Sequence, residues 1–452
     1  MKDRGIAICS NFTLMTLVFY LILQQGIPCY AQQAESLLKH SIVIDNIEFE
    51  NTDFSDLMPL KEKIKNARVV VLGEITHSDG STMKAKTRMV KFLHEEMGFD
   101  VLAWEAGFID CWFLNNGLRA DIPLREAKNN LMRGGWDASF YIQPLFEYVR
   151  ESWNTEAPLE MAGFDQNRPP NGTKNFKKIL NELTKRSRVI SLSESENEAV
   201  DGLLKCIYGY LGNEYSKSFS KNSFIKATNA LKSIYKRLEN DAGKLETSFS
   251  PRFIQLIKFS LQSALMQAED WDLYNNRKFD ERNLSRDKHM AERFNWLQKE
   301  LYPNRKIIIW AASAHLMRNA NQIVSLNPKV IYTGAIHMGH YLYLDLKEDL
   351  YTIAFTTHHG NIGSVYPEDD REDRLEAIPK PLDGSYEDIA HKTGKAYLFT
   401  DLKNLPEEHW LQHKVVAYPF GLIPNETQWG NIIDAFFFID EMIPDRRLPR
   451  GK

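Results

Sequence analysis

Short runs of β-branched and aliphatic residues, each followed by glycine or by polar residues, recur along the chain. Residues 65–73 form one such run, with Val-Val-Val-Leu before Gly73, and residues 99–104 form another. Between these runs, apolar residues recur at three- and four-residue spacing up to Gly98, the pattern of an amphipathic helix that ends at a glycine cap. A strand, a helix and a second strand in this order predict a βαβ unit, and such units form parallel sheets.

Further apolar runs predict more strands of the same sheet. Residues 159–164 and 306–310 have the same short apolar character, and residues 432–439 repeat it later in the chain. Residues 175–301 differ, because Pro251 is their one proline and their apolar residues recur at helical spacing. We therefore predict an α/β fold with a mainly parallel central sheet flanked by helices, and a helical insertion at about residues 175–301.

The first residues have the three parts of a secretory signal peptide. A basic start is followed by a mostly apolar run at residues 14–23, and small residues around Ala31 suit a cleavage site. The run is too short to span a bilayer comfortably, although an uncleaved anchor is the alternative. We expect residues 1–31 to be removed and residues 32–452 to form the α/β domain. The protein is then periplasmic or secreted, with no membrane association beyond export.

Composition and charge exclude several classes of protein. With 43% hydrophobic and 26% charged residues, the 452-residue chain is neither disordered nor collagen-like. Its 56 basic and 60 acidic residues give a net charge of −4, so no nucleic-acid partner is expected. Without residues 1–31 only Cys111 and Cys206 remain, too few for an all-cysteine zinc site or a disulfide framework. We expect two buried free thiols, with a single bridge as the alternative.

Titratable side chains follow three of the predicted strands. Glu74 and His77 follow the first strand, Glu105 follows the second, and His315 follows the strand at residues 306–310. Ligands of open parallel sheets bind outside the carboxyl ends of the strands, so these residues are candidates for one site. Two carboxylates and two imidazoles suffice for acid–base chemistry or for a metal site. Each residue alone also fits a structural role. Glu74 could cap a helix and His77 could be a hydrogen-bonded loop histidine. Glu105 could be a paired buried carboxylate and His315 a core histidine.

The segments around these residues resemble the erythromycin esterase family. Its opening signature is similar to Gly-Glu-Ile-Thr-His at residues 73–77 and to Trp-Glu-Ala-Gly-Phe at residues 104–108. The resemblance spans about residues 60–440 and continues in three shorter segments, at residues 163–165, 286–291 and 310–315. It implies an erythromycin-esterase-like fold and a hydrolase that acts on a small-molecule ester or macrolactone. Macrolides, and through them antibiotic resistance, are the context of the family.

The resemblance also implies roles for individual residues. His77 takes the place of the general base that activates water, and Glu74 and Glu105 belong to the same group. Lys86 stands at the position of a site arginine, and His315 matches another active-site histidine. The family scheme requires no metal, so the resemblance implies no cofactor.

Residue chemistry leads to the same mechanism without the family. A neutral imidazole takes a proton from water near pH 7, and a carboxylate at its other nitrogen fixes the tautomer. Lys86, Arg88 or a protonated His315 can stabilise the oxyanion, and we assign Arg88 to substrate binding. The chain has no Gly-x-Ser-x-Gly segment, which argues against a serine nucleophile and favours direct attack by water.

Two segments depart from the family pattern. Where the family usually has Trp-Ala-His-Asn-x-His, residues 310–315 read Trp-Ala-Ala-Ser-Ala-His, so His315 is kept while a histidine and an asparagine are lost. After His77, Ser-Asp-Gly replaces the usual Gly-Thr followed by arginine or lysine. These changes remove hydrogen-bonding groups, and they leave open whether the substrate is a macrolide.

Three other functions compete with this one. A metallohydrolase would use the same residues together with His337 and His340, beside an expected tyrosine-rich strand, and with His358 and His359. An exported haem- or metal-binding protein of the same fold would need an exposed histidine or tyrosine ligand. A role in surface polysaccharide or envelope metabolism is the third alternative.

Overall fold

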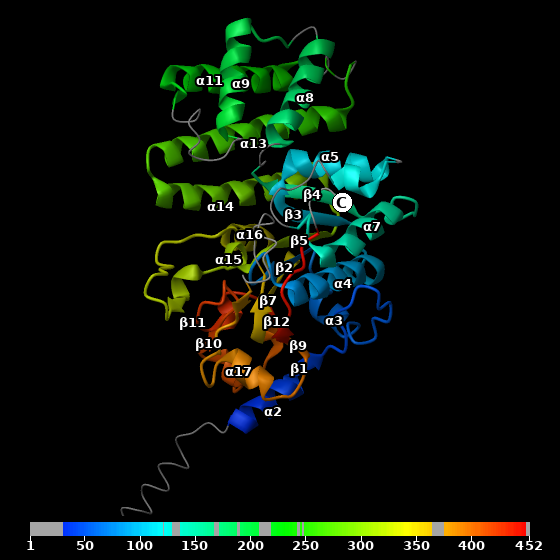
Figure 1. Ribbon diagram of the computed structural model, residues 1–452, viewed down its shortest axis with the longest axis vertical. Coiled ribbons are helices and arrows are strands. Elements are labelled where there is room, and N and C mark those ends of the chain that lie inside the picture. Colours follow the sequence, from blue (N-terminus) through cyan, green and yellow to red (C-terminus); the bar gives the residue numbers. More distant parts are fainter. Residues whose placement is uncertain are drawn as a thin grey trace, which may run out of the picture.

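The computed structural model describes most of the chain (Figure 1). The described residues are 30–120, 122–128, 136–166, 171–187, 190–207, 218–241, 245, 248–363 and 375–448. The signal peptide expected at residues 1–31 therefore lies almost wholly outside them. Within these ranges, no helix has the length and apolar character that crossing a membrane requires.

A mixed sheet of nine strands runs through the described part of the molecule. Its order is β1 (Ser41–Val43), β9 (Tyr397–Asp401), β12 (Ala435–Met442), β7 (Leu350–Ile362), β2 (Val69–Glu74), β5 (Ile307–Ala312), β3 (Val101–Gly107) and β4 (Glu160–Asp165), with β8 (Glu376–Ala377) paired to β7. The strands from β12 to β4 are parallel, whereas β1, β9 and β8 are antiparallel to their neighbours. The predicted α/β fold with a mainly parallel sheet is confirmed.

The central strands are apolar because both faces of the sheet are covered. Every residue of β2 is buried, and its side chains alternate between two hydrophobic cores. Val69 and Val71 face one core, and Val70 and Leu72 face the other. A strand enclosed in this way needs apolar residues at every position, which explains the continuous run seen in the sequence.

Helices cover the two faces as separate layers. Helices α3 (Leu60–Ile64), α4 (Gly80–Met97) and α7 (Gln143–Ser152) pack on the face of Val70, whereas α14 (Phe279–Trp296) and α16 (Met338–Leu346) pack on the face of Val71. Figure 1 shows α4 and α16 on opposite sides of the strands. The remaining short helices are α2 (Tyr30–His40), α5 (Phe108–Arg119), α6 (Leu124–Lys128), α15 (Ser313–Leu316) and α17 (Tyr386–His391). Helix α4 ends at Gly98, whose φ of 69° forms the predicted glycine cap.

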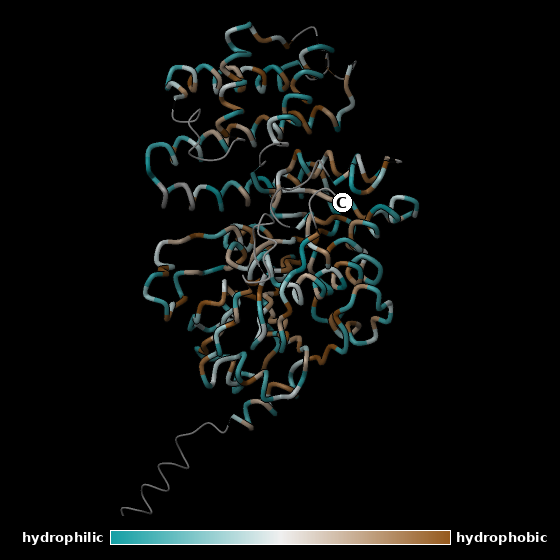
Figure 2. The backbone as a smooth tube through the Cα atoms, in the orientation of Figure 1, coloured by the Kyte–Doolittle hydropathy of each residue, from teal (hydrophilic) through white to brown (hydrophobic). Residues whose placement is uncertain are grey.

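A series of helices follows β4 and precedes β5. They are α8 (Asn171–Arg186), α9 (Glu194–Ile207), α11 (Lys221–Asn240), α13 (Pro251–Asn275) and α14. In Figure 1 they stack at one end of the molecule, with α13 and α14 between the outer helices and the sheet. Figure 2 shows hydrophobic and hydrophilic residues alternating along their turns, as amphipathic helices require. At the other end, β10 (Val415–Ala417), β11 (Asn425–Thr427) and β6 (Val324–Ser325) form a small antiparallel sheet.

The tyrosine-rich segment expected as a strand is instead helix α16. Tyrosine and leucine alternate from Tyr341 to Leu344, which is typical of a strand. The buried residues Met338, Leu342 and Leu346, however, recur every four residues and pack in one core. Helical burial of these residues prevails over the local alternation, so the strand prediction for this segment is wrong.

The close packing of α16 on α15 gives a test of the fold. A Cβ at Gly339 would lie 2.0 Å from the carbonyl oxygen of Leu316, whereas a Cβ at Gly430 meets nothing closer than 3.9 Å. We expect Gly339→Ala to lower the free energy of unfolding by about 1–3 kcal/mol, because the two helices must move apart. Gly430→Ala, the control, should change it by under about 1 kcal/mol. Equal stability of the two variants in urea denaturation would contradict this packing.

Candidate active site

The carboxyl ends of four parallel strands bring titratable residues to one edge of the sheet. Glu74 is the last residue of β2, Glu105 lies near the end of β3, and Asp165 is the last residue of β4. Glu74 is level with Ala312 of β5, after which α15 carries His315. These side chains lie together because β2, β5, β3 and β4 are neighbours in the sheet, although β5 comes much later in the sequence.

Glu74 lies at the centre of a buried ion pair. Its side chain is 0% exposed, as is that of Lys86, whose ammonium donates to Oε2 of Glu74. Lys86 Nζ also lies 4.1 Å from the ring centroid of Trp310. Burial raises the pKa of Glu74, but Lys86 and His77 outweigh this effect and hold it below its ordinary value. Glu74 is therefore an anion in the folded protein.

His77 lies against this anion. Its Nδ1 is 3.1 Å from Oε1 of Glu74, so Nδ1 carries the hydrogen and donates it to the carboxylate. The side chain is 29% exposed. The ring of Trp136 packs edge-on against it, with 5.0 Å between the two ring centroids. His77 thus combines a fixed orientation with access to solvent, as a proton acceptor requires.

Asp79 closes the loop that carries His77. Its Oδ2 accepts hydrogen bonds from the backbone amides of Ile75, at 3.0 Å, and Thr76, at 3.4 Å. Burial, together with the negative charge of Glu74, raises the pKa of Asp79 to about 8. A protonated Asp79 adds no second negative charge beside Glu74. In the sequence, Asp79 stands out only as part of the Ser-Asp-Gly segment that departs from the family pattern.

Residues that follow β7 and β12 hold the same loop from outside. Arg447 donates to the carbonyl oxygen of His77 at 2.9 Å. The backbone amides of Gly363 and Asp445 donate to the carbonyl oxygen of Ser78 at 3.0 and 2.9 Å. The loop is therefore clamped between β2 and the segment that follows β12.

His315 lies in a second charged group, between two carboxylates. Its Nδ1 donates to Asp287 Oδ1 at 2.6 Å, and its Nε2 lies 3.3 Å from Glu105 Oε1 and 3.0 Å from Nη1 of Arg286. Burial lowers the pKa of His315 and Arg286 opposes its charge, but Glu105 and Asp287 prevail and raise this pKa to about 10. His315 is therefore a cation at neutral pH, suited to stabilise negative charge and not to accept a proton.

Arg286, from α14, joins the strand ends to this group. It donates to Asp165 at 3.2 and 2.7 Å and to Glu105 at 3.0 Å. The other carboxylate oxygen of Glu105 accepts the backbone amide of Ala312 at 2.9 Å, and His337 lies 3.1 Å from Asp287. The sequence predicted no site role for Arg286, Asp287 or Asp165, and it predicted His337 only as a metal ligand of the alternative metallohydrolase. The segments at residues 163–165 and 286–291, quoted for the family resemblance, were the available signal.

Arg88 lies outside both groups. Its guanidinium is 1% exposed and pairs with both carboxylate oxygens of Asp56, at 2.9 and 2.7 Å. It also donates to the backbone carbonyls of Asn46 and Asp53, at 2.5 and 2.6 Å. These contacts fasten α4 to the segment after β1, and they do not support the substrate-binding role predicted for Arg88.

Ala312 and Ser313, at the end of β5 and directly after it, depart from the family pattern, and both make structural contacts. The hydroxyl of Ser313 donates to the carbonyl oxygen of Gly73 at 2.6 Å, which joins α15 to β2. Ala312 holds Glu105 through its backbone amide, as described above.

Cys111 and Cys206, the two described cysteines, are both buried free thiols.

Comparison with known proteins identifies the family. A family model for erythromycin esterase matches residues 94–442. The chain belongs to the erythromycin esterase family. The match includes Glu105, Arg286 and His315 but begins after Glu74 and His77, so the roles of these two residues rest on geometry and on the resemblance of residues 73–77.

Relatives extend the comparison to almost the whole chain. YbfO of Bacillus subtilis, which bears a provisional hydrolase name, is 26% identical over 88% of this chain and 89% of its own. Erythromycin esterase type II of Escherichia coli is 21% identical over 90% of this chain and 97% of its own. Family membership thus indicates a hydrolase with a small-molecule substrate.

Solved structures show the same fold. A protein named for succinoglycan biosynthesis has a TM-score of 0.74 and 19% identity, over 93% of this chain and 99% of that chain. An erythromycin esterase variant in its open conformation has a TM-score of 0.66 and 19% identity, over 88% of this chain and 97% of that chain.

The charge of His315 makes stability depend on pH. Its pKa rises from 6.5 to about 10 on folding, so its stabilisation is full below pH 6.5 and is lost as the pH rises through about 10. The free-energy difference between the parent and His315→Gln, from urea denaturation, should therefore be largest below pH 6.5 and shrink toward pH 10. His413→Gln, at an exposed histidine, is the control. A difference for His315→Gln that does not change with pH would contradict the cationic assignment.

Proposed function

We propose that this protein hydrolyses a carboxylic ester or lactone by direct attack of water, with His77 as general base and no covalent intermediate. Family membership supports a hydrolase, and the arrangement of His77, Glu74 and Lys86 supports this mechanism. The decisive observation is the 3.1 Å contact between Nδ1 of His77 and the buried carboxylate of Glu74.

The first step is proton transfer from water to His77. Because Nδ1 donates its hydrogen to Glu74, the lone pair of the neutral ring lies on Nε2, and this atom takes the proton. The resulting imidazolium is stabilised by the anion of Glu74, whose own charge is held by Lys86. Lys86 therefore acts through Glu74 as a positioning residue.

The second step is the stabilisation of the oxyanion. As the water oxygen bonds to the carbonyl carbon, negative charge develops on the carbonyl oxygen, and the intermediate then expels the alkoxide. Both nitrogens of His315 already face protein groups, so the cationic ring stabilises that charge through its own positive charge and not by donating a hydrogen bond. The alkoxide takes its proton from the His77 imidazolium. Glu105 and Asp287 hold His315 in its charged form.

The carboxylates at this edge already have cationic partners. Glu74 pairs with Lys86, and Glu105 and Asp165 pair with Arg286. A metal ion at these oxygens would have to displace the buried ammonium of Lys86 or the partly buried guanidinium of Arg286. This pairing is the reason for proposing a metal-independent reaction and not a metallohydrolase.

Replacement of His77 tests the mechanism. His77→Asn keeps a hydrogen-bond donor but removes the base, so kcat on a responsive ester or lactone should fall at least ~10²-fold. The substrates are a panel of aryl esters and of 14- and 16-membered lactones, and mass spectrometry follows the gain of one water. Prior treatment with a chelator should leave the rate of the parent unchanged.

A matched variant separates loss of the base from loss of structure. His413→Asn should keep the parental rate, and the free energy of unfolding of His77→Asn should fall by no more than about 1 kcal/mol. Full activity in folded His77→Asn would remove this residue from the mechanism. Loss of activity on chelation, restored by zinc, would favour the metallohydrolase.

We also propose that the reaction takes place outside the cytoplasm, because residues 1–31 have the layout of a signal peptide. Mass spectrometry of protein from the periplasm or culture medium should find an N-terminus at or near Gln32. Mature protein that retains Met1 would show that the segment is not removed.

A further inference from the structure

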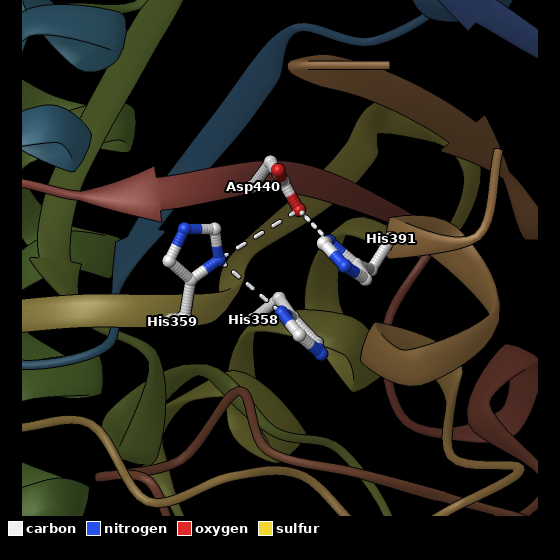
Figure 3. A group of neighbouring side chains, drawn as sticks. All are labelled: His358, His359, His391 and Asp440. Atoms are coloured by element: carbon white, nitrogen blue, oxygen red, sulfur yellow. Dashed lines mark hydrogen bonds and ion pairs between the residues drawn. The ribbon is translucent and has the colours of Figure 1, made fainter. Parts of the chain in front are cut away.

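Three histidines and an aspartate meet on the other half of the sheet, over β7 and β12. His358 and His359 lie on β7, His391 is the last residue of α17, and Asp440 lies on β12. Figure 3 shows their side chains converging from these three elements. Within the described residues, this is the group of histidine, cysteine and acidic side chains that has metal-ligand spacing.

The distances between the nitrogen and oxygen atoms of these side chains are close to those between the ligands of a small bound ion. Nδ1 of His358 lies 3.2 Å from Nδ1 of His359, and Nδ1 of His391 lies 2.7 Å from Oδ1 of Asp440. His359 Nδ1 is 4.0 Å from the same oxygen, and one atom of each residue lies within 4.8 Å of all the others. Four ligands at ~2.0–2.2 Å from zinc are separated by roughly 3.4 Å. The ligand atoms are therefore near enough to share one ion once the stacked rings of His358 and His391 have turned toward it.

The backbone beneath the group is rigid. β7 and β12 form a parallel ladder in which His359 is level with Glu441, and the amide of Asp440 donates to Ala396 at 2.8 Å. Helix α17 is fixed by buried residues, among them Tyr386 and Ile389, and by a cap in which Ser385 accepts from an amide of its first turn. Ion binding thus has to order only side chains.

The three histidine rings pack against one another. The rings of His358 and His391 stack at 3.9 Å, and His359 lies edge-on to both. Neutral imidazole is the ligand form, and His359 and His391 are 47% and 45% exposed, so an ion can enter from solvent. Solvated surface histidines would not need to converge from three elements.

We propose that His358, His359, His391 and Asp440 bind one divalent transition-metal ion of the zinc type. Imidazole-rich sites with one carboxylate suit zinc, copper or nickel, whereas magnesium and calcium prefer oxygen ligands. The ion joins α17 to two neighbouring strands. The site is distinct from the Glu74, His77 and His315 region, so it stands independently of the proposed hydrolysis.

Calorimetric titration of the purified protein with ZnCl₂ tests the site. The protein carries no polyhistidine tag and is first treated with a chelator and dialysed. We expect saturation at one zinc per chain, a higher melting temperature with zinc, and no such binding of magnesium. Removal of one ligand, in His391→Asn or in Asp440→Asn, should weaken zinc binding at least ~10-fold and abolish the zinc-dependent shift in melting temperature.

Two further variants make the result decisive. His413→Asn removes an exposed histidine outside the group and should bind zinc like the parent. Absence of saturable binding in the parent overturns the proposal, as does undiminished binding in both ligand variants with circular dichroism that matches the parent. Binding that is lost in His315→Asn but kept in His391→Asn would assign the ion to the candidate active site and would also overturn the proposal.

Discussion

The buried pair of Glu74 and Lys86 is the constraint on which the candidate active site depends. Neither side chain has any exposed surface. Removal of one partner of such a pair leaves an uncompensated buried charge, which typically costs about 3–5 kcal/mol. Because Glu74 ends β2 and Lys86 lies on α4, the pair fixes the helix against the strand that precedes it. The short loop between them, with His77, has little freedom left.

Arg286 performs the corresponding task for the other carboxylates. It satisfies Glu105 of β3 and Asp165 of β4 together, and it lies beside His315 after β5. One guanidinium from α14 therefore contacts side chains at or after the ends of three strands. A lysine, with its single point charge, could not hold all of these groups as well. Charge neutralisation by residues from the helices thus adds to the apolar packing and the backbone pairing that hold this edge of the sheet.

Prediction from the sequence succeeded where burial imposes a local pattern. β2 was recognisable because both its faces are covered, so Val69 to Leu72 are all apolar. Lys86 and Arg88 show where such reasoning ends. They are two residues apart on α4, about 200° around the helix, and only the position of the strand decides which of them meets Glu74. Asp287 and His337, in turn, meet across 50 residues of sequence, a contact that no local pattern reveals.

The clamp on the His77 loop has a consequence for the order of events during folding. Arg447 follows His77 by 370 residues, yet it binds the carbonyl oxygen of that residue. β2, the strand before this loop, pairs with β5 and β7, so it too is completed by segments that come much later in the sequence. The loop between β2 and α4 takes its final shape only when these distant segments have met it. A protein cut before Arg447 would therefore keep the contact of His77 with Glu74 but lose one of the contacts that hold the loop from outside.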